Sequence, residues 1–462
     1  MTEKIADFVV STDYAKLPDE AVDTAKMAIL DGLGVTLAGS RHPLGEAITG
    51  HVKELGGKTE ASVIGCGFKT NAPQAALANG TMAHALDYDD ASGWAFHPTA
   101  VLLPAILALG EANHISGKEA LIAYVLGFEM ATRLGMNVTE RLATCGWHQT
   151  GVVGAMSVAL ACARILKLNK QQVRMTMGIA ASMAAGVRIN FGTMTKPLHG
   201  GNTARNGVVA AKLAASGITA NEDILEAPGG YYSTFCAGSG YDLDQVLGGE
   251  LGNPWILVSQ GVIIKVYPAC RGTHRCLDAA LYLKHKYDLS AGDIAGVECI
   301  TSDTLRTSLM YSRPKTTLEA KFCVEYCVAA ALLDGHIGLQ HFTEEKVFEP
   351  RVQEFLTRVK YVHPEELKGW QGRKKPETVT VKLKDGRQFS HSVDQAKGAL
   401  ENPTTYEEVL TKYRECAAFA LSDDAVDNTI DLVANLEKVK DVAELGDMVI
   451  GSAKKRSTVR LS

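Results

Sequence analysis

The sequence predicts a mainly α-helical protein, in which a large all-helical domain from both chain ends accompanies a smaller α+β domain. Three observations support this prediction. The chain of 462 residues is long enough for two or three domains. Residues 1–265 are rich in alanine and glycine and carry apolar side chains at helical spacing. Strand-like alternation is concentrated in residues 266–396, and helical periodicity returns in residues 397–462.

The composition is typical of a soluble globular protein, with 46% hydrophobic and 21% charged residues. A net charge of -5 argues against nucleic acid as the main partner. The 10 cysteines are scattered without a C-x-x-C pair, which indicates a reducing, cytoplasmic compartment. The uncharged run 142–163 contains His148 and three glycines. It is therefore predicted as a buried helix with a lead-in loop, and no membrane partner is expected.

The N-terminal region predicts consecutive helices joined by short loops. Acidic residues at 19–20 favour a helix start, and apolar residues then recur at every fourth position as far as Leu37. Pro73 opens an alanine-rich helix. The capping-box pattern at 116–119 and the asparagine at 169 mark two further helix starts.

The C-terminal region mixes short strands with helices. An Asp-Gly turn between two alternating segments predicts a β-hairpin. The expected elements are an extended segment at Val262–Pro268, a helix at Thr273–Tyr287, a strand at Val297–Thr301, a helix at Thr317–Leu333, hairpin strands at Thr378–Leu383 and Arg387–Val393, and helices at Thr404–Leu421 and Asp424–Glu437.

The stretch Gly192–Gly207 combines Lys196 and His199 with paired glycines. Proline at 197 disfavours helix at the residue before it, and Asn202 or the next residue is a good N-cap. The stretch is therefore predicted as a loop that leads into a helix N-terminus, where a carboxylate or phosphate could bind. The alternative is a surface lysine in an ordinary loop.

A polar segment, residues 84–98, contains His84, Asp87, Asp89, Asp90 and His97. Three interpretations are open. The side chains could bind a divalent metal, they could perform acid–base chemistry on an oriented histidine, or the aspartates could cap a helix.

Three further positions could carry chemistry. His148 stands before an uncharged helix, and its position alone indicates a buried core histidine. Residues 265–275 hold three cations, including Lys265 and Arg271, together with Cys270. They form either a solvated basic loop or a second anion clamp, in which Arg271 would offer two donors to a carboxylate. Tyr311 belongs to a weaker polar cluster.

Together these clusters supply lysine, arginine, histidine and tyrosine at helix edges, which suits a small polycarboxylate substrate. The sequence contains no G-x-x-x-x-G-K-[ST] loop, no G-x-G-x-x-G after a strand and no H-E-x-x-H pattern. We therefore expect neither a nucleotide nor a redox cofactor.

Several multi-residue motifs also resemble, in the same order, those of the MmgE/PrpD family, which includes 2-methylcitrate dehydratases, iminodisuccinate epimerase and cis-aconitate decarboxylases. The resemblance covers nearly the whole chain. The matching segments are Ile29–Gly39, His84–Asp90, His97-Pro98, His148 with Val152–Ala155, Thr195–His199 with Gly201-Asn202, Tyr267–Cys270, Glu319–Phe322 and Leu332–Gly335.

The resemblance implies an all-helical domain formed by both chain ends, a smaller α+β lid, and a homodimer with the site between the domains. It also implies that neither a metal nor an organic cofactor is needed. The residues that match the active site of the decarboxylase members are Asp87, His97, His148, Lys196, Lys265 and Tyr311.

Two positions depart from the decarboxylase members. They have threonine where this chain has Ala91, and histidine where it has Cys270. Loss of a histidine from the acid–base set disfavours decarboxylation of cis-aconitate and leaves dehydration and epimerisation open.

We therefore predict a lyase that removes a proton next to a carboxylate, as a 2-methylcitrate dehydratase does. Such a reaction needs cations where negative charge develops, and Lys196, Lys265 and Arg271 are expected to supply them. His97 or His148 would act as the base. The residues with supporting roles are Tyr311 as an alternative acid, Asp87 as the group that orients a histidine, and His199 and Cys270 as substrate contacts.

Three alternatives remain at this point. One is an epimerase of an amino-dicarboxylate such as iminodisuccinate, which uses the same α-proton chemistry. Another is a cis-aconitate decarboxylase. The third is a non-enzymatic helical protein that binds carboxylates.

Overall fold

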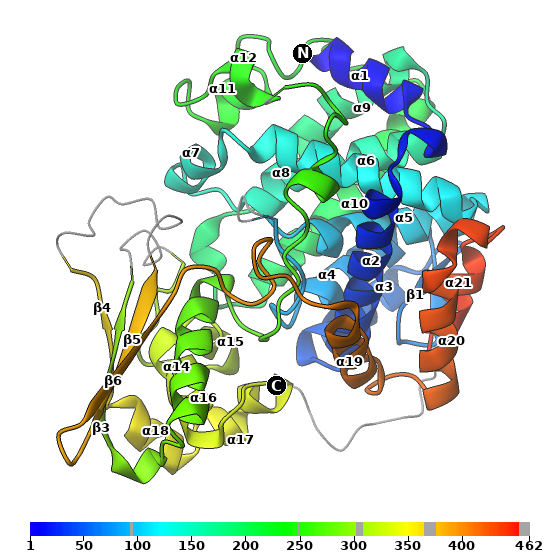
Figure 1. Ribbon diagram of the computed structural model, residues 1–462. Coiled ribbons are helices and arrows are strands. Elements are labelled where there is room, and N and C mark those ends of the chain that lie inside the picture. Colours follow the sequence, from blue (N-terminus) through cyan, green and yellow to red (C-terminus); the bar gives the residue numbers. More distant parts are fainter. Residues whose placement is uncertain (93–95, 248, 302–307, 365–375, 452–462) are drawn as a thin grey trace.

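The computed structural model describes residues 1–92, 96–247, 249–301, 308–364 and 376–451. As predicted, a large helical body carries a smaller α+β lid (Figure 1). The helices and the small hairpin of the body are α1 (Thr2–Ser11), α2 (Asp19–Gly39), α3 (Pro43–Leu55), β1 (Ala61–Val63), β2 (Phe68–Thr70), α4 (Ala72–His84), α5 (Pro98–Asn113), α6 (Gly117–Gly135), α7 (Thr139–Thr144), α8 (Gln149–Ile165), α9 (Lys170–Met183), α10 (Thr195–Ala215), α11 (Tyr231–Phe235), α12 (Leu243–Val246), α13 (Ile256–Ser259), α19 (Tyr406–Ala417), α20 (Asp423–Ala434) and α21 (Ala443–Val449).

Both chain ends contribute to one hydrophobic core. Leu33 of α2 and Tyr413 of α19 are both fully buried in it. Figure 1 shows the C-terminal helices beside α2. The close approach is possible because Gly34 faces Tyr413, where a Cβ atom would lie 3.1 Å from the tyrosine ring. The chain therefore returns to the body after it has built the lid.

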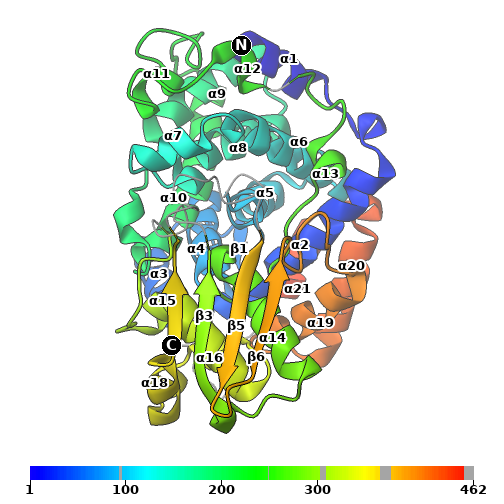
Figure 2. The same ribbon diagram turned by 60° about the vertical axis from the view of Figure 1, so that its left-hand side comes forward.

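The lid is a four-stranded sheet in the order β4-β3-β5-β6, covered on one face by helices α14 and α16 (Figure 2). Strand β3 is parallel to β4 and antiparallel to β5. Buried Val379 and Val381 belong to a second core made only of lid residues. We propose residues 266–396 as the limits of the lid. Its elements are α14 (His274–Lys286), β3 (Ile294–Ile300), α15 (Thr317–Ala320), α16 (Val324–Asp334), α17 (Glu344–Val347), α18 (Pro350–Leu356), β4 (Val359–Val362), β5 (Glu377–Leu383) and β6 (Gln388–Val393).

Local sequence signals placed several elements well. The side chain of Ser116 accepts from the Glu119 N–H, and the Glu119 carboxylate accepts from the Ser116 N–H, as a capping box requires. Asn169 and Gln172 cap α9 in the same way. The predicted hairpin is the β5–β6 pair, and Gly386 in its turn has a φ of 91°, which glycine adopts without strain.

The predicted loop at Gly192–Gly207 is wrong. Helix α10 begins at Thr195, so Lys196 and His199 lie in its first two turns. Proline at 197 is tolerated there because the first-turn N–H groups have no partner within the helix. The anion site predicted in front of Asn202 is therefore replaced by side chains that project from the helix itself.

The extended segment expected at 262–268 lies outside the sheet, and one antiparallel bridge joins its Ile263 to Ala91. The helix expected at 317–333 is broken into α15 and α16. The break frees the Lys321 carbonyl, which accepts from the Cys270 N–H at 2.9 Å, and Cys323 then caps α16 through its sulfur.

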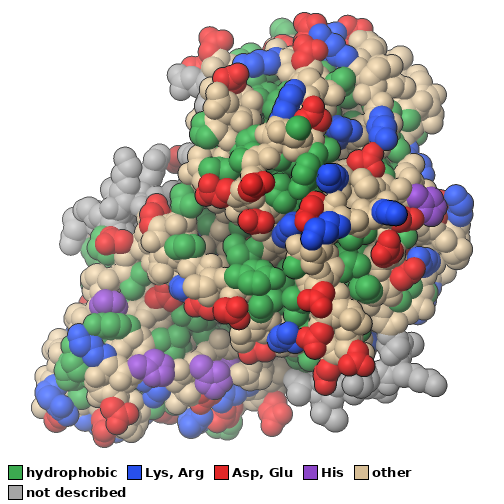
Figure 3. Space-filling model, turned by 45° about the vertical axis from the view of Figure 1, so that its right-hand side comes forward, with side chains coloured by type: hydrophobic (Ala, Val, Ile, Leu, Met, Phe, Trp, Pro, Cys, Tyr) green, Lys and Arg blue, Asp and Glu red, His purple; other side chains and the backbone are tan. Residues whose placement is uncertain are grey.

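The uncharged run at 142–163 is part of α7, a connecting loop and the buried helix α8, which agrees with the predicted core helix. Among the described residues, the helices lack the combination of length and apolarity that a membrane span needs. Figure 3 shows acidic and basic side chains interspersed on one face of the molecule.

Candidate active site

The crossing of α4 and α10 places the end of one helix beside the start of the other. At this crossing the backbones nearly touch, because a Cβ atom on Gly201 would lie 2.1 Å from Thr81 Oγ1 and 2.3 Å from the Leu77 carbonyl oxygen. Only glycine permits such an approach. His84, the last residue of α4, therefore lies near Lys196 in the first turn of α10.

Asp87 is the anionic centre of the site. Its backbone has a φ of 50°, a left-handed conformation that aspartate adopts more readily than most residues. Its Oδ1 lies 2.7 Å from Lys196 Nζ and 3.2 Å from Lys265 Nζ. Lys265 also donates to the Asp87 backbone carbonyl at 2.8 Å. Although burial opposes ionisation, the two ammonium groups hold the pKa of Asp87 well below its usual value.

Asp89 holds two imidazole rings. His84 Nδ1 lies 3.0 Å from both oxygens of Asp89, and His97 Nδ1 lies 3.0 Å from Asp89 Oδ2 and from the Asp90 carbonyl oxygen. Because these neighbours are acceptors, both Nδ1 atoms must carry hydrogen. The Nε2 atom of each neutral ring is then left with the lone pair. The role of orienting a histidine, predicted for Asp87, thus falls to Asp89 in this geometry.

His148 directly precedes α8 and faces His199 of α10. Their Nδ1 atoms are 3.1 Å apart, so one ring must donate and the other must accept. Burial, with Lys196 nearby, lowers the pKa of His148 well below 6.5 and that of His199 to about 4. Burial also lowers the pKa of His97, although Asp89 partly offsets this effect. The imidazoles are therefore neutral at neutral pH and can accept protons.

The predicted histidines and Lys196 do lie together. The ring centres of His97 and His148 are 6.5 Å apart, and His84 lies 4.5 Å and 6.0 Å from them, respectively. Lys196 lies close enough to lower the pKa of all three rings.

Aromatic side chains that sequence reasoning missed surround the Lys196 ammonium. Its Nζ is 5.4 Å from the ring centre of Phe191 and 5.2 Å from that of Phe322 in the lid, within the range of a cation–π interaction. Tyr311, also in the lid, donates to the Phe191 carbonyl oxygen at 2.8 Å. Phe322 had a sequence signal, since it belongs to a motif that resembles the family, whereas Phe191 had none.

The remaining predicted residues lie at the edge of this cluster. Cys270 is half-buried, and burial followed by the charge of Asp87 raises the pKa of its thiol. Arg271 begins the turn before α14, where its charge acts on the buried groups His274 and Glu377. Burial lowers the pKa of nearby Lys321, which sequence reasoning gave no role, to about 7.

The three interpretations of the polar segment can now be compared. Asp90 accepts from the Thr99 N–H and hydroxyl near the start of α5, as the capping interpretation requires. Donor atoms of His84, Asp87, Asp89 and His97 lie within 4.8 Å of one another, a spacing that could hold a metal ion. However, two lysines already neutralise Asp87 and two imidazoles already engage Asp89, which favours the acid–base interpretation.

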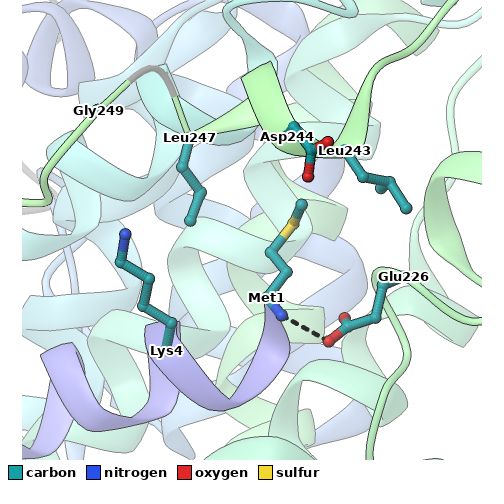
Figure 4. A pocket seen from close by; sticks show the side chains of 7 residues that line it. All are labelled: Met1, Lys4, Glu226, Leu243, Asp244, Leu247 and Gly249. Carbon is teal, nitrogen blue, oxygen red and sulfur yellow. Dashed lines mark hydrogen bonds and ion pairs between the residues drawn. The ribbon is translucent and has the colours of Figure 1, made fainter.

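A pocket of about 560 Å³ is lined by none of the site residues described above (Figure 4). In it, the Met1 ammonium contacts a Glu226 oxygen at 2.6 Å. Its lining residues are Met1, Lys4, Glu226, Leu243, Asp244, Leu247 and Gly249.

Comparison with protein families confirms the resemblance seen in the motifs. Residues 3–244 match the MmgE/PrpD N-terminal domain, and residues 267–438 match the MmgE/PrpD C-terminal domain. The chain belongs to the MmgE/PrpD family. The two matches cover most of the body and of the lid.

Relatives of this MmgE/PrpD chain are named as lyases. It is 30% identical to cis-aconitate decarboxylase of Mus musculus, over all of this chain and 96% of the relative. It is 29% identical to that of Homo sapiens, over 98% and 95%. It is 25% identical to 2-methylcitrate dehydratase of Cupriavidus necator, over 77% and 75%. The prediction of an MmgE/PrpD-family enzyme is thus confirmed at the level of the family.

Proposed function

We propose that this enzyme removes a proton next to a carboxylate of a small polycarboxylate, and that the reaction is a dehydration of the 2-methylcitrate type. The observation that carries the proposal is the pair of buried lysines on one carboxylate, beside imidazoles with fixed tautomers. Lys196 and Lys265 place two ammonium groups on the single carboxylate of Asp87 in a buried setting, where a cation can stabilise a developing carbanion strongly.

The base in this mechanism is a histidine. Removal of a hydrogen next to an ionised carboxylate adds a second negative charge to the same carbon–oxygen system, so the base works only beside cations. His97 suits this role because Asp89 and the Asp90 carbonyl hold its Nδ1–H, which directs the Nε2 lone pair away from them. After it takes the proton, the imidazolium is stabilised by the Asp89 carboxylate.

A second group must protonate the leaving hydroxyl. His148 could supply this proton only as an imidazolium, a form that burial and the nearby Lys196 disfavour. Tyr311 is the alternative acid, since burial raises the pKa of its phenol and keeps the proton on it.

Two buried acceptors support a substrate that carries a hydroxyl group. Among the described residues, Asp87 Oδ2 and His84 Nε2 have no hydrogen-bond partner. A buried acceptor without a donor costs free energy, and a substrate hydroxyl could satisfy either one.

Decarboxylation of cis-aconitate is the second candidate, because relatives of that name match nearly the whole chain. The same lysine pair would stabilise the carbanion left after loss of CO₂. Epimerisation of an amino-dicarboxylate is the third candidate, and it needs no leaving group.

One experiment separates these candidates. Purified enzyme is incubated in D₂O with citrate, 2-methylcitrate, cis-aconitate or iminodisuccinate, and the products are followed by NMR with parallel detection of CO₂. An alkene without CO₂ supports dehydration. CO₂ release supports decarboxylation, and deuterium in the substrate without an alkene supports epimerisation.

The site itself is tested with two variants. Lys196→Met and His148→Gln should each lower kcat/KM by about 100-fold or more, whereas Lys58→Met, at a side chain that is 79% exposed, should leave it unchanged. Full activity in both site variants would refute the proposed site.

We also expect dialysis against EDTA to leave activity intact, since the proposed chemistry uses side chains only.

We further propose that the enzyme is a homodimer, as the family resemblance implies. Light scattering coupled to size-exclusion chromatography should give twice the chain mass of 49.4 kDa, and a mass of one chain would contradict this.

A further inference from the structure

Lys412 lies next to the candidate site and contacts three segments of the chain. Its Nζ donates to the backbone carbonyls of Tyr88 at 2.8 Å and of Lys265 at 2.9 Å, and forms an ion pair with Asp31 Oδ1 at 2.7 Å. The side chain is buried, and the ammonium lies 3.9 Å from the ring centre of Tyr88. Two hydrogen bonds and one ion pair therefore hold the ammonium in place.

The two carbonyls belong to the segments that build the anionic centre. Tyr88 directly follows Asp87, and Lys265 donates to both the carbonyl and the carboxylate of Asp87. The bridge between Ala91 and Ile263 joins the same two segments nearby. Lys412 thus connects both segments, through carbonyl groups at or next to the residues of the Asp87–Lys265 contact.

We propose that Lys412 is a positioning residue that sets the separation of Asp87 and Lys265, and thereby the place of the positive charge in the site. Asp31 balances the charge of Lys412. The two hydrogen bonds from Lys412 to the backbone carbonyls of Tyr88 and Lys265 are the contacts that position the site. The kinetic part of this proposal rests on the proposed function, whereas its structural part does not.

A purely structural role for the Asp31–Lys412 pair makes a different prediction. Loss of one partner from a buried ion pair is strongly destabilising, whereas loss of both is often tolerated. If the pair served folding only, a variant that lacks both charges would regain stability and activity together. If Lys412 positions the site, that variant would regain stability alone.

The test compares Lys412→Met, the double variant Asp31→Asn/Lys412→Met, and Lys26→Met as the matched control. Lys26 also links α2 to C-terminal residues, through Glu437 at 2.6 Å and the Ala434 carbonyl at 3.0 Å. For each variant we would measure Tm, kcat and KM on the substrate that the wild type converts, and the Asp87–Lys265 distance in a crystal structure.

We expect the double variant to unfold near the wild-type temperature, yet to lose about 10- to 100-fold in kcat and in kcat/KM alike, as a misplaced catalytic group does. Lys26→Met should change Tm alone. Wild-type kcat in the double variant would overturn the proposal, and because that variant lacks a lone buried charge, it carries the test even if Lys412→Met fails to fold.

If the wild type converts no substrate of the panel, the proposed function fails separately. The crystal structure of the double variant then decides. An Asp87 Oδ1 to Lys265 Nζ distance that stays at 3.2 Å would overturn the positioning role, and a longer distance would support it.

Discussion

Asp89 determines which nitrogen of His97 is available as a base. Its carboxylate accepts from the Nδ1–H groups of both His84 and His97, so both rings are held in one tautomer. An amide at this position offers one acceptor and one donor, and the donor would meet a nitrogen that must itself donate. With such an amide, the His97 ring could keep its position while its tautomer changes.

Asp89→Asn should therefore lower kcat/KM strongly, by up to about 10⁴-fold, which is the loss seen when a catalytic histidine loses its orienting carboxylate. Steady-state kinetics measures the effect. Asp441→Asn is the matched control, because Asp441 pairs with the exposed His114 at 2.8 Å and should give wild-type kinetics. Equal activity in both variants would show that Asp89 does not orient the base.

His84 competes with His97 for the same carboxylate. The Nδ1–H of His84 donates to Asp89 and partly satisfies its negative charge. Removal of this hydrogen bond should make Asp89 a stronger partner for the His97 imidazolium. His84→Phe is expected to raise the pKa of His97 and to move the acid limb of the kcat/KM profile upward by about one pH unit. A limb that stays in place or moves to lower pH would contradict this coupling.

Among the secondary-structure elements, the α4–α10 crossing does most to assemble the site. A Cβ atom on Gly201 would meet the backbone of α4 within 2.3 Å, so Gly201→Ala must push the two helices apart. We expect a loss of about 1–3 kcal/mol in the free energy of unfolding, together with reduced kcat/KM. Denaturant unfolding and kinetics measure the two effects.

Gly50→Ala in α3 is the control for this substitution. A Cβ atom there has nothing within 4 Å, so alanine should stabilise the helix by about 0.5–1 kcal/mol. If Gly201→Ala behaved like Gly50→Ala, close packing at the crossing would be unimportant.

The success of sequence reasoning varied between elements for a physical reason. Capped helices such as α6 and α9, and the β5–β6 hairpin, are specified by residues within a few positions of each other. The start of α10 and the break at Lys321 are not. The break is stabilised by the Cys270 N–H, about fifty residues away in sequence, and no local pattern encodes that partner.

The same limit applies to the site. The motifs identified the residues that meet there, including Asp87, His148 and Lys196. They did not identify which aspartate orients a histidine, because the three aspartates are nearly adjacent in sequence and only the left-handed turn at Asp87 separates their directions. They also missed the pairing of Asp31 with Lys412, whose partners lie near opposite ends of the chain.

For the whole molecule, buried histidines predict loss of stability in acid. Burial lowers the pKa of His42 and His199 to about 4 and that of His84 and His274 to about 3. Below pH 6.5 the unfolded chain therefore binds more protons than the folded one, so the free energy of unfolding falls as the pH drops from about 6.5 towards 3. A series of Tm measurements across this range checks the trend, and a flat profile between pH 6.5 and 4 would contradict it.

The pairing of Asp31 with Lys412 also bears on biosynthesis. Helix α2 leaves the ribosome early, and its buried carboxylate has no counter-ion until α19 is made, after the entire lid. A nascent chain that stops short of α19 would contain the site motifs but could not close the core around them. We therefore expect the helical body to complete its folding only after α19 has been made, and until then the chain would expose apolar surface.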